Sequence, residues 1–202
     1  GVAALYSNTS GDMNSAFGYQ SLLSNTSGFW NLAAGGWALY SNTTGNNNTA
    51  NGVDALRANT LGFNNTATGT GALYFNTEGI NNTANGIGAL RSNTIGISNV
   101  SIGINSLHLN TTRSNLVAVG DSALYNNDVG ATLSFHATAN TAIGSKALFT
   151  NSTGYYNAAL GYQSLYSNTT GFANTANGNE ALFSNITGNN NTANGNYSLK
   201  YN

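Results

Sequence analysis

The stretch GGWALYSNTTGNNNTANG, residues 35–52, contains one complete copy of a repeat that runs through the whole chain. The unit reads G-x-x-A-L-x-x-N-T-T-G-x-x-N-T-A-x, and its opening glycine recurs every 17 residues except for one step of 24 residues. The units start at residues 1, 18, 35, 52, 69, 86, 103, 120, 144, 161, 178 and 195. We therefore expect a single repeat array over residues 1–202, with a seven-residue insertion at about 131–137.

A unit of this length is too short for a pair of helices but suits one coil of a β-solenoid. Equivalent residues of successive coils then stack about 4.8 Å apart. The expected fold class is all-β, a β-solenoid or β-roll of about twelve coils. Unit position 5, counted from the opening glycine, is Leu in every copy and is the expected core: Leu5, Leu22, Leu39, Leu56, Leu73, Leu90, Leu107, Leu124, Leu148, Leu165, Leu182 and Leu199.

Alternation in the segment N-T-A-x predicts a strand that points positions 14 and 16 inward and positions 15 and 17 outward. The segment G-x-x-A-L-x-x-N fits either a second strand or a single helical turn. Glycine opens every unit and occupies position 11 in ten of eleven units, with Arg113 as the exception. These two positions fit corners that need positive φ or close backbone approach.

Asparagine is invariant at position 8 and nearly so at position 14, where Leu116 is the exception. A buried amide costs free energy unless it is hydrogen-bonded, and identical amides stacked coil over coil can satisfy one another. We expect two such ladders, which include Asn8, Asn25, Asn42, Asn59, Asn76 and Asn93 at position 8, and Asn48, Asn65 and Asn82 at position 14. The alternative is that position 8 merely closes a surface turn before T-T-G.

Two variable positions predict a partner face. Position 6 is rich in aromatic residues and position 17 is apolar in four successive units, so lateral packing against another copy is the simplest use for both. The residues concerned are Tyr6, Tyr40, Tyr74, Tyr125 and Tyr166 at position 6, and Ile102, Val119, Ile143 and Leu160 at position 17. A second possibility is that Tyr6, Trp37, Tyr40 and Tyr74 stack on sugar rings.

Composition argues against several kinds of function. Only 11 residues are charged and the net charge is −1, so the positive stripe of a nucleic-acid-binding protein is absent. No apolar run approaches the roughly 20 residues that insert across a membrane. His108 and His136 have no acidic partners at a metal-binding spacing. The G-x-G pairs at 69–71 and 86–88 lack the Lys or helix of a phosphate site. We therefore expect no enzyme, no catalytic residue, no metal and no cofactor.

Many Asn residues lie in N-x-S/T sequons, most of them through composition alone. Position 8 keeps Asn where the hydroxyl is lost, which indicates a structural demand. Position 13 varies as a surface position does, and possible glycan sites are therefore Asn47, Asn64, Asn81 and Asn190.

The repeat resembles those of bacterial and phage tail-fibre-like surface proteins, most clearly at residues 35–52 and 161–178. The stretch N-T-A-I-G, residues 140–144, is similar to the N-x-A-x-G core of the head repeats of YadA-type trimeric autotransporter adhesins, which form a β-roll. The resemblance departs from that family in its longer period. It implies an extracellular, cell-surface or virion-surface fibre, often a homotrimer.

The function expected is a structural extracellular fibre or adhesin shaft that associates with copies of itself. The alternative is a phage tail-fibre segment or a carbohydrate-binding surface. An ice-binding solenoid is a remote third, because the threonine columns at positions 9 and 15 are interrupted. Neither end shows a capping segment, so we expect a piece of a longer array or end-to-end stacking into a filament.

Overall fold

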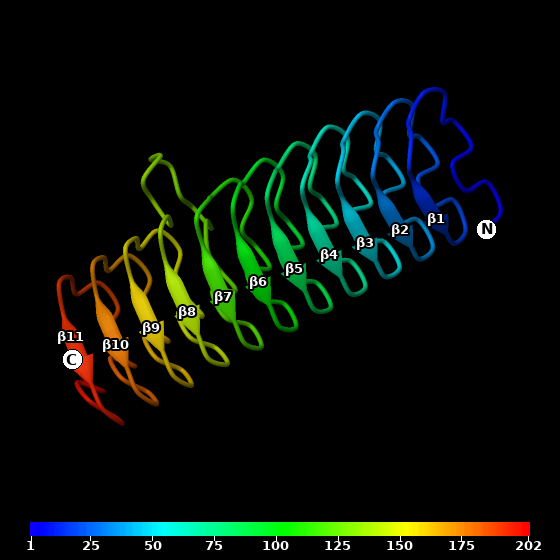
Figure 1. Ribbon diagram of the computed structural model, residues 1–202. Helices are drawn as coiled ribbons and strands as arrows, with labels where there is room; N and C mark the ends of the chain where they lie inside the picture. Colours follow the sequence, from blue (N-terminus) through cyan, green and yellow to red (C-terminus); the bar gives the residue numbers. More distant parts are fainter.

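The computed structural model describes residues 1–202 as a rod of stacked coils, with the two termini at opposite ends (Figure 1). One short strand per complete unit lies along one side of the rod. The eleven strands are β1 (Ser15–Phe17), β2 (Leu32–Ala34), β3 (Thr49–Asn51), β4 (Thr66–Thr68), β5 (Thr83–Asn85), β6 (Val100–Ile102), β7 (Val117–Val119), β8 (Thr141–Ile143), β9 (Ala158–Leu160), β10 (Thr175–Asn177) and β11 (Thr192–Asn194). The expected β-solenoid is confirmed.

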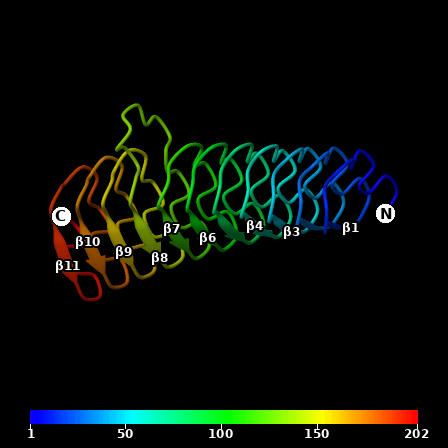
Figure 2. The same ribbon diagram turned by 45° about the horizontal axis from the view of Figure 1, so that its top comes forward.

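All strands are parallel and pair in chain order, so the sheet never crosses over. Each residue pairs with its equivalent one unit later, as Ala33 does with Ala50. The same register holds across the long unit, where Ala118 pairs with Ala142. The additional residues leave the coil as a loop between β7 and β8, on the side of the rod away from the strands (Figure 2). The insertion therefore does not disturb the sheet.

The interior is narrow and holds mainly leucine and alanine. Ten of the twelve position-5 leucines are fully buried, while Leu5 is partly buried and Leu199 is 49% exposed. These two lie in the first and last coils, which have a neighbour on one side only. The middle residue of each strand, alanine in ten strands and Ser101 in β6, faces inward, as the alternation predicted. Burying one leucine side chain contributes about 1.5–3 kcal/mol, so this column is a main source of stability.

The segment between the opening glycine and position 8 contains no helix, so the helical turn considered for it is absent. It is not a regular strand either, because positions 3 and 5 have left-handed backbone in every coil. In the Gly86 coil, Leu90 has φ 50°. Its N–H donates to Ser106 O of the next coil, while Asn105 N–H donates back to Ile87 O. Backbone hydrogen bonds thus join this segment to both neighbouring coils.

The two glycine positions are required for different reasons. Gly86, which opens its coil, has φ 140° and faces the carbonyl of Gly103, so a Cβ would be both strained and obstructed. Gly79, at position 11, needs no left-handed backbone. A Cβ there would instead collide with the side-chain oxygen of Asn76 and the carbonyl of Gly96. The opening corner therefore needs both positive φ and close approach, whereas the position-11 corner needs close approach alone.

The loop runs from Val129 to His136, slightly nearer the N terminus than expected. Ala137 is already back in the coil, fully buried, and its carbonyl accepts a hydrogen bond from Asn127 Nδ2 at 3.0 Å. Ala137 therefore occupies position 11 of this unit. Gly130, which the 17-residue spacing placed there, lies in the open loop with no atom near its Cβ position.

Candidate functional site

The position-8 asparagines form a continuous internal ladder. Asn76 Nδ2 donates to Asn59 Oδ1 at 2.8 Å in the preceding coil and to Gly79 O at 3.0 Å in its own coil. The same pair of bonds recurs at Asn42, Asn59 and Asn93, and these side chains are fully buried. The expected ladder is confirmed, and the alternative of a simple surface turn is wrong.

The position-14 asparagines form a second ladder of a different kind. Asn65 Oδ1 accepts the backbone N–H of Asn82 at 3.0 Å and its Nδ2 at 3.2 Å. Asn65 Nδ2 donates to Gly79 O at 2.8 Å, the same carbonyl that Asn76 uses. The position-11 carbonyl therefore links the two ladders at each coil. Here the side chain bonds mainly to backbone, whereas identical amides bonding to one another were expected.

The irregular Gly103 and Gly120 coils share a partly buried ion pair. Asp128 replaces Thr at position 9, and its carboxylate accepts from the backbone N–H groups and hydroxyls of both Thr111 and Thr112. Arg113 Nε donates to the other carboxylate oxygen at 2.6 Å. Arg113 also donates to the carbonyls of Ala131 and Ser134, so it fixes the loop to the rod.

Two opposing effects set the pKa of Asp128. Burial raises the pKa of this carboxyl, since only 3% of the side chain is exposed. The hydrogen bonds from Thr111, Thr112 and Arg113, together with the charge of Arg113, outweigh burial and hold the pKa below its usual value. The carboxylate is therefore ionised at neutral pH. The sequence marks this region as irregular through the insertion and the exceptions Arg113 and Leu116, and the contact found there is internal to the chain.

The position-6 side chains stack on one another along the rod. From His108 onward, the rings of Tyr125, Phe149, Tyr166 and Phe183 lie face to face, with centroids 5.1–5.4 Å apart. Nearer the N terminus, the guanidinium of Arg57 lies over three rings, those of Trp37, Tyr40 and Tyr74, at 5.5–5.7 Å. Much of each ring face in this column is therefore covered within the chain, and Tyr6 alone is largely exposed, at 79%.

The outer face of the sheet carries no charged residue at position 15 or 17. Its central part is apolar, with Ile102, Ile143 and Leu160 each 39–48% exposed and Val119 partly exposed. A shallow groove of about 310 Å³ follows this face between the two columns over β8, β9 and β10. We call the outward side chains of β6–β9 the sheet patch.

All four possible glycan sites, Asn47, Asn64, Asn81 and Asn190, are exposed. Their backbone φ angles are 55–58°, in the left-handed region that Asn tolerates better than most residues. Every other residue at position 13 shares this conformation. The left-handed backbone thus explains why Asn is frequent at position 13. The same side chains are also accessible, as a glycan site must be.

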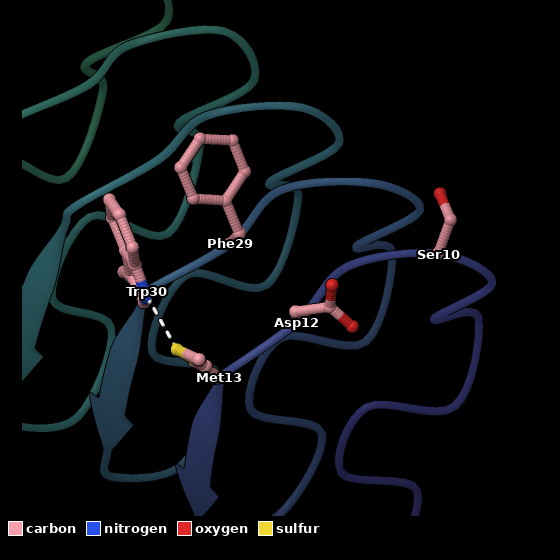
Figure 3. Close-up of a pocket in the computed structure, with 5 residues that line it drawn as sticks. All are labelled: Ser10, Asp12, Met13, Phe29 and Trp30. Atoms are coloured by element: carbon pink, nitrogen blue, oxygen red, sulfur yellow. Dashed lines mark hydrogen bonds between the residues drawn. The ribbon is translucent and has the colours of Figure 1, made fainter.

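A pocket of about 200 Å³ lies at the N-terminal end of the rod (Figure 3). Trp30 and Phe29 meet edge to face at 5.1 Å, and the indole N–H of Trp30 points to the sulfur of Met13 at 2.7 Å. Asp12 and Ser10 complete the lining. The walls are mainly apolar, and the indole N–H is already used by Met13.

A third hollow, of about 270 Å³, crosses the Gly69 and Gly86 coils. Its lining includes Tyr74, Arg91 and His108 from position 6 and Asp54 and Asn105 from position 3. It is the only one of the three pockets that gathers several polar and titratable side chains. The sequence did not predict this hollow, although the glycine pairs at 69–71 and 86–88 contribute two of its lining residues.

Three of the five basic side chains are paired: Arg57 with Asp54, Arg113 with Asp128, and Lys200 with Glu180. Arg91 and Lys146 form no ion pair or side-chain hydrogen bond. The structure brings no three His, Cys, Asp or Glu side chains together as a metal site, and His108 and His136 lie apart. None of its elements is a helix with the length and hydropathy to cross a membrane.

Comparisons of the chain with protein-family models, with curated proteins and with solved structures gave no match.

Proposed function

We propose that this β-solenoid is the shaft of an extracellular fibre or adhesin, in which copies of the chain pack side by side through the sheet patch. The observation that carries the proposal is the uncharged outer face of the sheet. Eleven strands spaced about 4.8 Å apart make this face roughly 50 Å long. A face of this length with an apolar centre suits an equally regular partner.

The distribution of charge supports the same proposal. All 11 charged residues lie outside positions 15 and 17, on the turns and the other sides of the coil. Charged residues are depleted at the centres of protein interfaces, and contiguous exposed apolar patches mark contact sites. Ile102, Ile143 and Leu160 would lose their exposed apolar area when a second copy covered them.

The internal ladders suit a mechanical role. Backbone hydrogen bonds join each coil to the next on all sides, and the two asparagine ladders add side-chain bonds in the interior. Pulling along the axis therefore loads many parallel bonds at once. The repeat's resemblance to bacterial and phage surface fibres suggests a location outside the cell or on a virion.

Sedimentation velocity tests the proposal. The wild-type chain should sediment as a species larger than its 20.8 kDa monomer. Ile102→Lys combined with Ile143→Lys places two charges on the sheet patch and should give monomers. The matched control, Ile95→Lys with Ile104→Lys, changes two isoleucines that are 53% and 51% exposed elsewhere and should still associate. A monomeric wild type, or equal loss in both double variants, would contradict lateral packing through this face.

A further inference from the structure

The hollow over the Gly69 and Gly86 coils arises because two successive coils lack a side chain at position 3. Gly71 and Gly88 have φ 65° and 64°. The other ten coils hold the same left-handed conformation at this position with a side chain, such as Asp54 at 59° and Asn105 at 54°. The backbone therefore does not require glycine here. A Cβ on Gly71 would meet open space, whereas at Gly88 the Asn105 side-chain oxygen and the His108 ring already fill the position that a Cβ would take.

Arg91 leans into this space with its charge unpaired. Its Nε lies 3.9 Å from the point where a Cβ on Gly71 would sit. The guanidinium carbon lies 5.0 Å from the ring centroids of Tyr74 and Phe75, which hold the group in place by cation–π contact. No acceptor in the chain takes its N–H donors. Such a preorganised fork suits two-point binding of a carboxylate.

His108 forms the neighbouring wall. Its Nδ1 lies 3.1 Å from Gly88 O, which assigns the proton to Nδ1 and leaves Nε2 free. The ring stacks on Tyr125 at 5.2 Å and is therefore held in one orientation. Burial lowers the pKa of His108, and the charge of Arg91 lowers it further, although the bond to Gly88 acts in the opposite direction. A bound anion would reverse the effect of Arg91.

The rest of the lining offers groups for hydroxyls. Asp54 has one carboxylate oxygen held by Arg57 at 3.0 Å, and no side-chain donor takes the other. The hydroxyl of Thr70 and the amide of Asn105 also line the hollow. The Asp54 charge disfavours a small multivalent anion, whereas its free oxygen can accept a hydroxyl proton. The lining thus combines a cationic side with hydroxyl-binding groups.

We propose that this hollow binds a small hydroxylated carboxylate, with the carboxylate on the Arg91 guanidinium and hydroxyls directed toward Asp54, Thr70 and Asn105. The site goes beyond the structural role proposed above and does not depend on it. It lies on the turn segment of the coils, whereas the sheet patch lies on the strands. A shaft could therefore carry this ligand while its sheet face is covered.

Titration calorimetry with glucuronate tests the proposal, with glucose and acetate as matched probes that lack the carboxylate or the hydroxyls. Glucuronate should bind at least about tenfold more tightly than either probe. Arg91→Met removes the fork and should weaken glucuronate binding by at least about tenfold. Gly71→Asn fills the hollow with a residue that Asn105 shows to be compatible with this backbone, and should weaken binding similarly. Lys146→Met, which removes the other unpaired cation, should bind like the wild type.

Nuclear magnetic resonance of His108 supplies a second readout. Saturating glucuronate should raise the pKa of His108 in the wild type and leave it unchanged in Arg91→Met. Circular dichroism of each variant checks that the fold is retained. Absence of glucuronate binding by the wild type would overturn the proposal. Equal affinity for acetate would overturn the hydroxyl contacts, and equal loss in Lys146→Met would show nonspecific charge attraction.

Discussion

The regular coils of residues 52–102 and the irregular pair at 103–143 provide a hydrogen-bond acceptor for positions 9 and 10 in two different ways. In the regular coils, the carbonyl of Thr77 accepts the N–H groups of Thr60, Leu61 and Gly62 and the hydroxyl of Thr60. In the Gly120 coil the chain departs into the loop just after this point. One carboxylate oxygen of Asp128 takes over the role of that carbonyl. The array therefore keeps a hydrogen-bond acceptor at this place, although a side-chain carboxylate replaces the backbone carbonyl.

The same comparison explains Arg113. Position 11 is normally Gly because a Cβ would strike the next coil's position-11 carbonyl. The coil after Arg113 is the one that bulges, so a side chain can leave the rod there. Arg113 then pairs with Asp128 and holds the loop carbonyls. The replacement of glycine by Arg113 and the insertion are therefore parts of the same structural feature, although they are separate irregularities in the sequence.

The largest effect should come from a charge in the regular core. Leu90→Asp places an unpaired carboxylate at a fully buried position and should cost about 4–5 kcal/mol, enough to unfold the surrounding coils. Leu133→Asp in the loop changes a side chain that is 49% exposed and should cost under about 0.5 kcal/mol. Urea denaturation with limited proteolysis measures both. Wild-type protease resistance in Leu90→Asp would refute the inward assignment.

Glycine substitution should separate the two regions next most strongly. Gly86→Ala meets both φ 140° and the carbonyl of Gly103, so we expect a loss of about 3 kcal/mol. Gly130→Ala in the loop has φ 78° and open space around its Cβ, so a loss of at most about 1 kcal/mol should follow. Thermal unfolding followed by circular dichroism compares them. Equal melting temperatures would mean that the corner tolerates a Cβ.

Substitutions in the two asparagine ladders should destabilise the fold by different amounts. Asn76→Ala removes a donor to Asn59 and the acceptor of Asn93 in a dry interior, and should cost about 2–3 kcal/mol. Asn82→Leu should cost less, because Leu116 already fills position 14 while fully buried. The two denaturation midpoints decide the question. A reversed order would show that the position-14 ladder carries more of the stability.

The smallest effect is confined to the loop and depends on pH. The pKa of Asp128 is depressed in the folded chain, so the stability that its carboxylate contributes is present above the unfolded pKa of about 3.9 and is lost as pH falls through the folded value. Hydrogen exchange followed as the pH is lowered through the folded pKa of Asp128 should show loop residues 129–136 opening while the coils at 52–102 stay protected. Asp128→Asn should open the loop at pH 7 as well. Uniform protection in both regions would exclude the proposed anchoring role.

Periodicity was sufficient to predict the solenoid, a strand over positions 14–17 that the structure has at positions 15–17, the inward leucines and the buried asparagines. Each of these depends only on equivalent residues meeting in successive coils. The left-handed backbone at position 5 could not be predicted, because that conformation favours Gly or Asn and the position is always Leu. Packing demands a large apolar side chain there and outweighs the local backbone preference.

The polar hollow shows what a residue-by-residue interpretation of a repeat omits. In chain order, Gly71 and Gly88 are simply the second glycines of the G-x-G pairs at 69–71 and 86–88. Their effect appears only when successive coils are compared. Position 3 lacks a side chain in two neighbouring coils, and Arg91 and His108 lean over the resulting hollow. The informative signal is glycine at position 3 in two successive units, which is seen when equivalent positions of the units are aligned.

One consequence of the stacking concerns how the rod folds. The strand bonds join residues one unit apart, 17 residues along the chain, and 24 only at the insertion. The mean sequence separation of contacts is then independent of how many coils the array has. Relative contact order falls as units are added, so a longer array need not form any more distant contact than a short one. Folding can start at any pair of coils and propagate in both directions, with the insertion coil as the slowest junction to cross.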